Sequence, residues 1–178
     1  MTIKSSQESK RKLRRLVAEF AKRGTKNNKG DIGEQWAREW FEHKGYDYFE
    51  FPQTPNTMPT SLSQCGGKRP DFALSLNTDE SFVYIDAKFH ATNNITEFGL
   101  TIDELKKYEA FKDWTVNELQ DDGERDIVFM LYPQELNGDR FTWILLDELL
   151  AGESTIMDGK PAKRISLLDR DDLWIDSP

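Results

Sequence analysis

Two apolar segments joined by a short polar connector constrain the fold of this chain more than any other feature of its sequence. Residues 71–76 read DFALSL, residues 81–90 read SFVYIDAKFH, and NTDE lies between them. Apolar runs of this length with so short a connection are typical of two antiparallel strands in a hairpin. We therefore expect a β-sheet built around this hairpin.

The second strand of the hairpin is expected to have two different faces, because successive side chains of a strand point to opposite sides. One face is entirely apolar and consists of Val83, Ile85, Ala87 and Phe89. The other begins apolar and becomes charged toward its C-terminal end: Phe82, Tyr84, Asp86, Lys88 and His90. A strand whose end lines a cleft shows such a gradient.

Asp71 is expected to lie in the same cleft. The start of the first strand of a hairpin lies near the end of the second, so Asp71 falls beside Asp86 and Lys88. Two carboxylates in one cleft repel each other unless a cation lies between them. Oxygen ligands from few side chains suit Mg²⁺, with Mn²⁺ as a substitute. Lys88 is then placed to hold a water or a phosphate oxygen.

The remaining sequence predicts helices and strands on both sides of the hairpin. Thr101 and Glu104 form a capping-box pattern that opens the helix after it. A mixed α/β sheet with helices packed on it is the economical architecture for this order, and residues 151–178 leave both a last strand and a short helix open. The expected elements are a helix over 31–45, a strand over 46–51, a loop over 52–70, the hairpin, a helix from 101 to 120, and strands over 126–132 and 140–149.

Charge divides the chain into two parts. Residues 1–30 contain ten Lys or Arg and two acidic residues, a net charge of +8, whereas residues 31–178 contain fourteen Lys or Arg and thirty acidic residues, a net charge of −16. We expect a basic N-terminal helix with a linker over 1–30 and one domain over 31–178. The helix can contact phosphates through Arg11, Arg14 and Arg15; packing of its apolar side on the body is an equally weighted alternative.

The sequence also indicates a compartment. A single cysteine, Cys65, excludes an intrachain disulfide and favours a reducing cytoplasm. The apolar runs, such as WILL at 143–146, are too short to cross a membrane. The basic N-terminus lacks the apolar segment of a secretory signal. We therefore expect a cytoplasmic protein without a membrane partner.

Glu34 is a further candidate for the charged cleft. On a helical wheel it lies at the edge of the apolar stripe of its helix, beside Phe41, and so points toward the body. Asp31 and Glu34 also have the spacing of a helix N-cap and its third residue. The spacing alone leaves the two interpretations open.

Glu34, the pair Pro70-Asp71 and the triplet Asp86-Ala87-Lys88 together resemble the PD-(D/E)XK nuclease superfamily. This fold is shared by many restriction endonucleases and Holliday-junction resolvases. The resemblance covers roughly residues 31–132 and includes the order of the elements. It implies a restriction-endonuclease-like mixed central sheet flanked by helices, and Mg²⁺-dependent cleavage of phosphodiester bonds.

The resemblance also implies a role for each motif residue. Asp71 and Asp86 would be metal ligands, and Asp86 stands where the family more often has Glu. Lys88 would orient or activate the attacking water and stabilise charge. Glu34 would be a further metal ligand or would contact the ligands.

Other polar residues are candidates for contacts with nucleic acid. Lys68 and Arg69 precede the motif and are expected to hold the scissile phosphate, and Lys106 lies in the following helix. His90 continues the charged face, where it either contacts the leaving group or the DNA backbone, or is a structural histidine.

Glu104 and Tyr108 occupy positions where some exonuclease branches have Gln and Tyr. Glu at the first position argues against an exonuclease.

The expected function is therefore that of a Mg²⁺-dependent DNA endonuclease, with a homodimer expected because two active sites are needed to cut both strands. Two alternatives remain open. One is a non-catalytic nucleic-acid-binding or assembly module of the same fold. The other is a toxin or defence nuclease that depends on a partner protein for targeting or inhibition. The sequence does not distinguish DNA from RNA.

Overall fold

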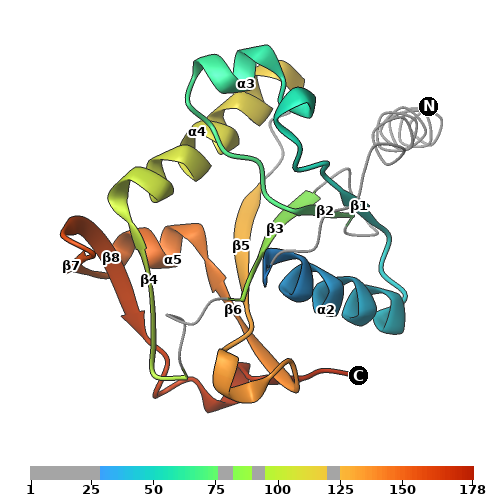
Figure 1. Cartoon of the computed structure of the whole chain (residues 1–178), viewed down its shortest axis with the longest axis vertical. Helices are drawn as coiled ribbons and strands as arrows, with labels where there is room; N and C mark the ends of the chain where they lie inside the picture. Colours follow the sequence, from blue (N-terminus) through green and yellow to red (C-terminus); the bar gives the residue numbers. More distant parts are fainter. Residues whose placement is uncertain (1–28, 76–81, 90–94, 120–124) are drawn as a thin grey trace.

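The structure is a computed structural model that describes residues 29–75, 82–89, 95–119 and 125–178 (Figure 1). The basic helix expected within residues 1–30, with Arg11, Arg14 and Arg15, lies outside these ranges, as does His90. Among the described residues, no helix is both long enough and apolar enough to span a membrane.

The predicted hairpin is confirmed. Strand β2 (Phe72–Ser75) pairs antiparallel with β3 (Phe82–Lys88), and Phe72 lies opposite Ile85. On its other side, β3 runs parallel to β5 (Asp126–Leu131). Parallel neighbours require a crossover connection, and helix α4 (Ile102–Leu119) lies in that connection.

The predicted mixed sheet is also confirmed. Within the described residues it has six strands in the order β1-β2-β3-β5-β6-β9. The pairings of this sheet in the described part are antiparallel apart from β3 with β5. The helix before the first three strands of this sheet and the helix before β5 follow the order that the family resemblance implies, and further short elements are inserted between them. The outer strands are β1 (Tyr48–Glu50), β6 (Arg140–Leu145) and β9 (Ile175–Asp176).

Helices cover both faces of this sheet (Figure 1). Helix α2 (Lys29–Lys44) packs Ala37 and Phe41 on one face. Helices α4 and α5 (Leu146–Ala151) pack on the other, with Tyr108 and Leu149 fully buried. In each helix the buried residues recur at helical spacing, so burial of one apolar stripe holds the helix to the sheet.

The predicted loop over 52–70 contains two short helices. These are η1 (Pro55–Thr57) and α3 (Thr60–Gln64). Leu62 of α3 is fully buried, and the Trp114 indole N–H donates to Ser61 Oγ at 2.8 Å, which ties α3 to α4. The prediction of a loop missed these helices, because a single buried leucine among prolines and small polar residues produces no periodic pattern.

The strand predicted over 140–149 ends at Leu145, and α5 follows. Leu146 and Leu149 are both buried, which is the i, i+3 spacing of a helix face. In this part the sequence prediction was wrong, because a short apolar run does not distinguish a strand from a buried helix.

A second, three-stranded antiparallel sheet was not predicted. Its order is β4-β8-β7, and it lies beside α4 and α5 in Figure 1. Gly99 of β4 lies so close to β8 that an added Cβ would be 2.8 Å from the carbonyl oxygen of Lys163. The strands are β4 (Glu97–Thr101), β7 (Glu153–Met157) and β8 (Lys160–Ser166). The short helix η2 (Gln134–Leu136) lies between β5 and β6, and η3 (Asp171–Leu173) lies between β8 and β9.

Candidate active site

The C-terminal end of β3 carries two buried charges. Asp86 and Lys88 are 3% and 4% exposed, and Lys88 Nζ lies 2.7 Å from Asp86 Oδ1. Burial lowers the pKa of Lys88, but the charges of Asp86 and then Glu104 outweigh this effect, and the pKa is raised above its ordinary value. Lys88 therefore keeps its proton, which a buried partner of two carboxylates requires.

Asp71 lies immediately before β2 and contacts the end of β3, as the hairpin geometry predicts. Its Oδ2 accepts a hydrogen bond from the Ala87 N–H at 2.8 Å. Burial raises the pKa of Asp71 well above its ordinary value, and the charges of Asp86 and Glu34 raise it further. The charges of Asp86 and Glu34 thus both act on Asp71.

Glu34 lies on α2 next to Gly33, where an added Cβ would be 3.8 Å from the carbonyl oxygen of Ala87 near the end of β3. Its charge contributes to the raised pKa of Asp71, so the two carboxylates act on each other. Glu34 Oε2 also lies 3.5 Å from Nη2 of Arg38, and the Arg38 guanidinium donates to both carboxylate oxygens of Glu50 at 3.0 Å. The structure therefore brings Glu34 to the same end of the sheet as Asp71 and Asp86. The side chain of Asp31, its alternative capping partner, is not described.

Helix α4 supplies Tyr108, which sequence reasoning did not include in the site. The Tyr108 hydroxyl donates to Asp86 Oδ2 and accepts from Lys88 Nζ at 2.9 Å. Burial, followed by the charge of Asp86, raises the pKa of Tyr108 well above its ordinary value, so the hydroxyl stays protonated and can donate. Both oxygens of Asp86 thus have a partner inside the protein.

Glu104 lies one helical turn before Tyr108 and joins two lysines. Its Oε1 accepts from Lys68 Nζ at 3.1 Å and from Lys88 Nζ at 3.2 Å. Burial raises the pKa of Glu104, but Lys88 and Lys68 outweigh it, and the pKa is lowered. The signal for both residues was their i, i+4 spacing on one face of α4. Sequence reasoning interpreted Glu104 as part of a helix cap, and it compared both residues with family positions without assigning either to the site.

The predicted nucleic-acid contacts have different surroundings. Lys68 lies in the cluster, with Nζ 4.0 Å from Asp86 Oδ2 and 39% of its side chain exposed. Lys106 is exposed on α4.

The prediction that Arg69 holds a phosphate is contradicted by its burial. Arg69 is 6% exposed, and its guanidinium donates to the Thr57 carbonyl at 2.6 Å, to Thr57 Oγ1 at 3.0 Å and to the Thr54 carbonyl at 3.4 Å. Arg69 therefore holds the segment around η1 in place and is not open to a phosphate.

The carboxylate oxygens of this cluster are ligands that suit a hard divalent cation, but they are not arranged as a preformed metal site. Asp71, Asp86 and Glu34 are oxygen donors of the kind Mg²⁺ prefers, and a cation would relieve the repulsion that raises the pKa of Asp71. Within the described residues, however, no three His, Cys, Asp or Glu side chains are grouped closely enough to hold a metal. Binding would require Asp86 to exchange Lys88 or Tyr108 for the ion.

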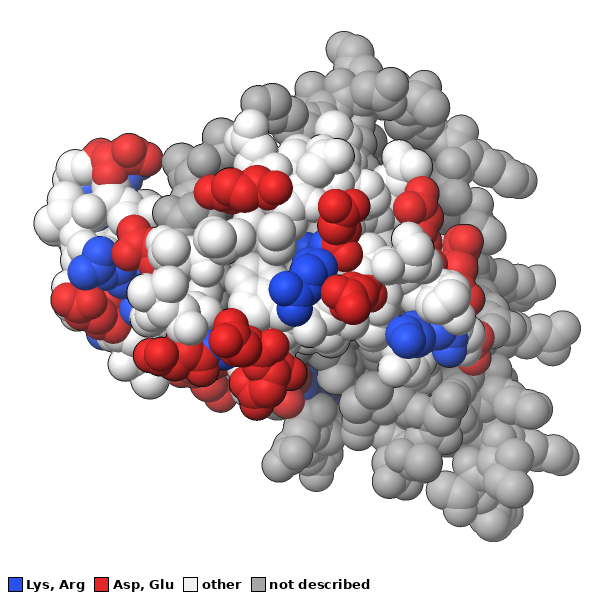
Figure 2. Space-filling model, turned by 90° about the horizontal axis from the view of Figure 1, so that it is seen from below, with Lys and Arg blue, Asp and Glu red and all other residues white. Residues whose placement is uncertain are grey.

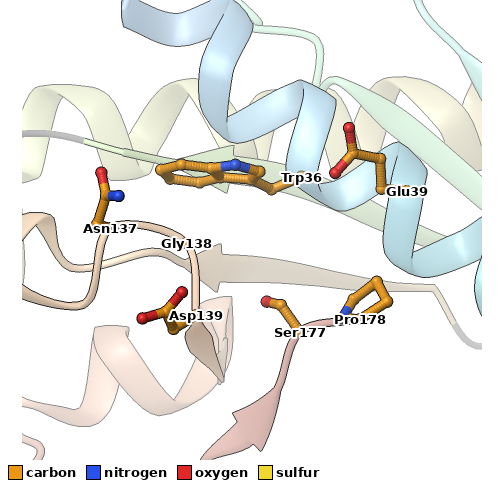
Figure 3. A pocket seen from close by; sticks show the side chains of 7 residues that line it. All are labelled: Trp36, Glu39, Asn137, Gly138, Asp139, Ser177 and Pro178. Atoms are coloured by element: carbon orange, nitrogen blue, oxygen red, sulfur yellow. The ribbon is translucent and has the colours of Figure 1, made fainter.

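A hollow of about 290 Å³ lies elsewhere, between α2 and the C-terminal residues. Figure 3 shows the indole of Trp36 over this hollow, with Asp139 and Ser177 on the opposite side. Glu34, Asp71, Asp86 and Lys88 do not line it. The charged cluster instead reaches solvent through the partly exposed side chains of Lys68 and Glu104.

Comparison with known proteins identifies little sequence similarity. The chain matches no protein-family model and no curated protein. Among solved structures, it is similar to Hjc, a Holliday junction resolvase of Archaeoglobus fulgidus, with a TM-score of 0.42, 12% sequence identity, and coverage of 81% of this chain and 90% of that chain. The function is therefore inferred from the residues of the site.

Proposed function

We propose that this chain is a divalent-metal-dependent nuclease that hydrolyses phosphodiester bonds of DNA, with endonuclease action. One observation carries the proposal. Asp71, Asp86 and Lys88 meet at the end of the hairpin, with Glu34 acting on Asp71 from another element. Burying mutually repelling carboxylates beside a lysine destabilises the fold, and such arrangements are concentrated at functional sites.

Mg²⁺, held by Asp71 and Asp86 with Glu34 as a further ligand, would polarise the scissile phosphate and lower the pKa of a bound water. In the hydrolysis, a water oxygen attacks phosphorus, the bond to the leaving sugar oxygen breaks, and that oxygen takes up a proton.

The chain's own residues supply charge and orientation. Because the pKa of Lys88 is raised, its ammonium is unsuited to act as a general base. It is suited instead to donate hydrogen bonds to the attacking water and to stabilise negative charge on the phosphate in the transition state. The Tyr108 hydroxyl accepts a hydrogen bond from Lys88 Nζ at 2.9 Å and so helps to hold this ammonium in position.

The rest of the surface does not favour DNA. Figure 2 shows one face on which acidic side chains form several clusters and basic ones lie among them. Residues 31–178 carry a net charge of −16. Affinity for a polyanion therefore depends on the basic residues 1–30, and deletion of residues 1–23 should weaken DNA binding and flatten its salt dependence. If the truncated chain binds DNA as tightly as the full chain at each of two salt concentrations, Arg11, Arg14 and Arg15 are not part of the DNA-binding surface.

The direct test is incubation of the purified chain with plasmid DNA and, in parallel, with RNA, in Mg²⁺, Mn²⁺ or EDTA. We expect cleavage of DNA with either metal and none in EDTA. Lys88→Ala should lose about 10²- to 10³-fold in rate, the loss typical when one transition-state donor is removed. Lys160→Ala changes an exposed lysine at the start of β8 and serves as the matched control.

Two results would contradict the proposal. If the wild-type chain leaves DNA and RNA intact with both metals, this chain alone is not a nuclease. If Lys88→Ala cleaves as fast as Lys160→Ala, the reaction takes place at another site.

A non-catalytic nucleic-acid-binding module is the second candidate. The observation that favours it is the pairing of both Asp86 oxygens with Lys88 and Tyr108, which leaves the described residues without a ready metal site. Addition of Mg²⁺ to the wild-type chain distinguishes the two functions without an activity assay. A nuclease site should raise the midpoint of thermal unfolding as Mg²⁺ increases, and Asp86→Asn should abolish the increase.

A homodimer is proposed with the nuclease function, since two sites are needed to cut both strands of a duplex. Light scattering with size-exclusion chromatography tests it. A monomer that still linearises plasmid would remove the dimer from the proposal.

A further inference from the structure

Glu104 has a carboxylate that the proposed reaction does not use, and its contacts point to a role. We propose that Glu104 is a positioning residue that holds Lys68 and Lys88 side by side, so that Lys68 contacts a phosphate of the nucleic-acid backbone while Lys88 remains with the carboxylates. The catalytic part of this inference rests on the proposed nuclease function; the phosphate contact of Lys68 does not.

The Glu104 side chain does not complete a helix capping box. The Glu104 N–H donates to Thr101 Oγ1 at 3.3 Å, which is one half of the capping box. In a complete box the Glu side chain would bond back to the N-cap backbone. Instead its Oε1 accepts from both Lys68 and Lys88. A carboxylate that bridges two ammonium groups fixes their separation, since both donate to the same oxygen.

The two lysines differ in exposure. The side chain of Lys88 is 6% exposed and lies 2.7 Å from Asp86, whereas that of Lys68 is 39% exposed and lies 4.0 Å from Asp86. Glu104 accepts one of the three protons of the Lys68 ammonium. The exposed fraction shows that Lys68 can be reached from solvent, where a phosphate group of a polymer would approach.

The backbone of Lys68 is anchored, so its side chain starts from a defined position. Its N–H donates to the carbonyl oxygen of Lys107 in α4 at 3.0 Å. The next residue, Arg69, is buried and bonded to the segment around η1. The ammonium group of Lys68 also lies 5.0 Å from the centre of the Tyr108 ring, a distance at which a cation is attracted to the ring face.

The charge of Glu104 has two opposing consequences. It holds both lysines close to Asp86, but it also competes with a phosphate for Lys68 and repels that phosphate. Removal of the charge should therefore raise affinity for nucleic acid and lower kcat. A residue with a purely structural role would lower both together with the melting temperature.

The binding experiment needs no activity. Affinity of the full chain for a fluorescein-labelled DNA oligonucleotide is measured by anisotropy in EDTA over a series of NaCl concentrations. Lys68→Ala should reduce the slope of log K against log salt by about 0.7 to 0.9, the value for one lost phosphate contact. Lys68→Arg should retain the wild-type slope, as should the control Lys160→Ala. An unchanged slope in Lys68→Ala overturns the phosphate contact.

A double-mutant comparison tests whether Glu104 acts through Lys68. Glu104→Gln keeps an acceptor oxygen and removes the charge, and it should raise oligonucleotide affinity in the wild-type background. In the Lys68→Ala background the same substitution should have a smaller effect, because the ammonium it acts on is gone. Equal effects in both backgrounds overturn the proposed coupling.

The catalytic experiment uses the same variants with Mg²⁺ and plasmid DNA. Glu104→Ala should lower kcat on the order of tenfold to a hundredfold, the scale of a misplaced catalytic group, and Glu104→Gln should lower it less. Both should keep the wild-type melting temperature and should bind the oligonucleotide more tightly than the wild-type chain. Unchanged kcat in Glu104→Ala overturns the positioning role. If the wild-type chain does not cleave at all, the nuclease proposal fails, and the binding experiments still decide the role of Lys68.

Discussion

The two faces of β3 have the same degree of burial but different chemistry. Toward α2, Ile85 and Ala87 are 0% and 8% exposed and contact apolar side chains. Toward α4, Asp86 and Lys88 are 3% and 4% exposed and contact charged and hydroxyl groups. The first face contributes free energy through burial of apolar surface. Burial of charge on the second face destabilises the fold unless every charge has a partner, which indicates a functional role for these charges.

The difference predicts that the two faces respond differently to substitution. Changes toward α2 should lower stability and affect function only through unfolding. Changes toward α4 should act on charge balance, and a second, compensating change should be able to repair them.

The largest expected effect is on the apolar face. Phe41 is fully buried and its ring lies 5.4 Å from that of Phe72. Phe41→Ala leaves a cavity and should lower the free energy of unfolding by about 3–5 kcal/mol. Urea unfolding followed by circular dichroism measures it. A loss below about 1 kcal/mol would mean that α2 is not a principal part of the core.

On the charged face, Lys88→Met should lower the free energy of unfolding by about 3 kcal/mol, because Asp86 stays buried without its cation. A second substitution, Asp86→Leu, removes the uncompensated charge and should restore most of the loss. The same urea titrations measure both variants. A double variant no more stable than Lys88→Met would show that packing, and not charge, sets the stability of this face.

Tyr108 should matter more for its hydroxyl than a buried tyrosine of the opposite face. Tyr108→Phe leaves Asp86 without a hydroxyl donor and should cost about 1–3 kcal/mol. The control is Tyr132→Phe, since the Tyr132 hydroxyl has a sulfur partner, Met130 Sδ at 3.6 Å, and should cost less. Thermal unfolding compares them. Equal losses would contradict a special role for the Tyr108 hydroxyl.

The smallest expected effect is a dependence of stability on pH. The folded pKa of Asp71 is raised above its ordinary 3.8, so the folded chain binds this proton more tightly than the unfolded chain. Stability contributed by the protonated form is present below pH 3.8 and is lost as pH rises through the raised folded pKa.

Asp71→Asn should remove this part of the decline. Unfolding free energies of both chains across that pH range, in EDTA, provide the measurement. A decline as steep in the variant as in the wild type would assign the proton to another group.

Much of the charged site could be predicted from the sequence because its signals are local. The alternation along 81–90 assigned Asp86 and Lys88 to one face, and the short connector placed Asp71 beside them. The helical wheel made Glu34 a candidate, with a capping role as the open alternative. The catalytic roles of these residues remain predictions.

The tertiary structure decided how those charges are compensated. Tyr108, Glu104 and Lys68 reach Asp86 and Lys88 from segments whose own patterns indicate a core helix, a helix cap and a polar loop.

The sequence by itself thus determined the hairpin, the faces of β3 and the mixed α/β order, because strand period and turn length depend on neighbouring residues. The tertiary structure alone decided the burial of Arg69, the pairing of β4 with β8 and the bridge from Glu104 to two lysines. Each of these depends on contacts between residues far apart in the chain. A local sequence pattern does not indicate which side chains such contacts bury or which charges they bring together.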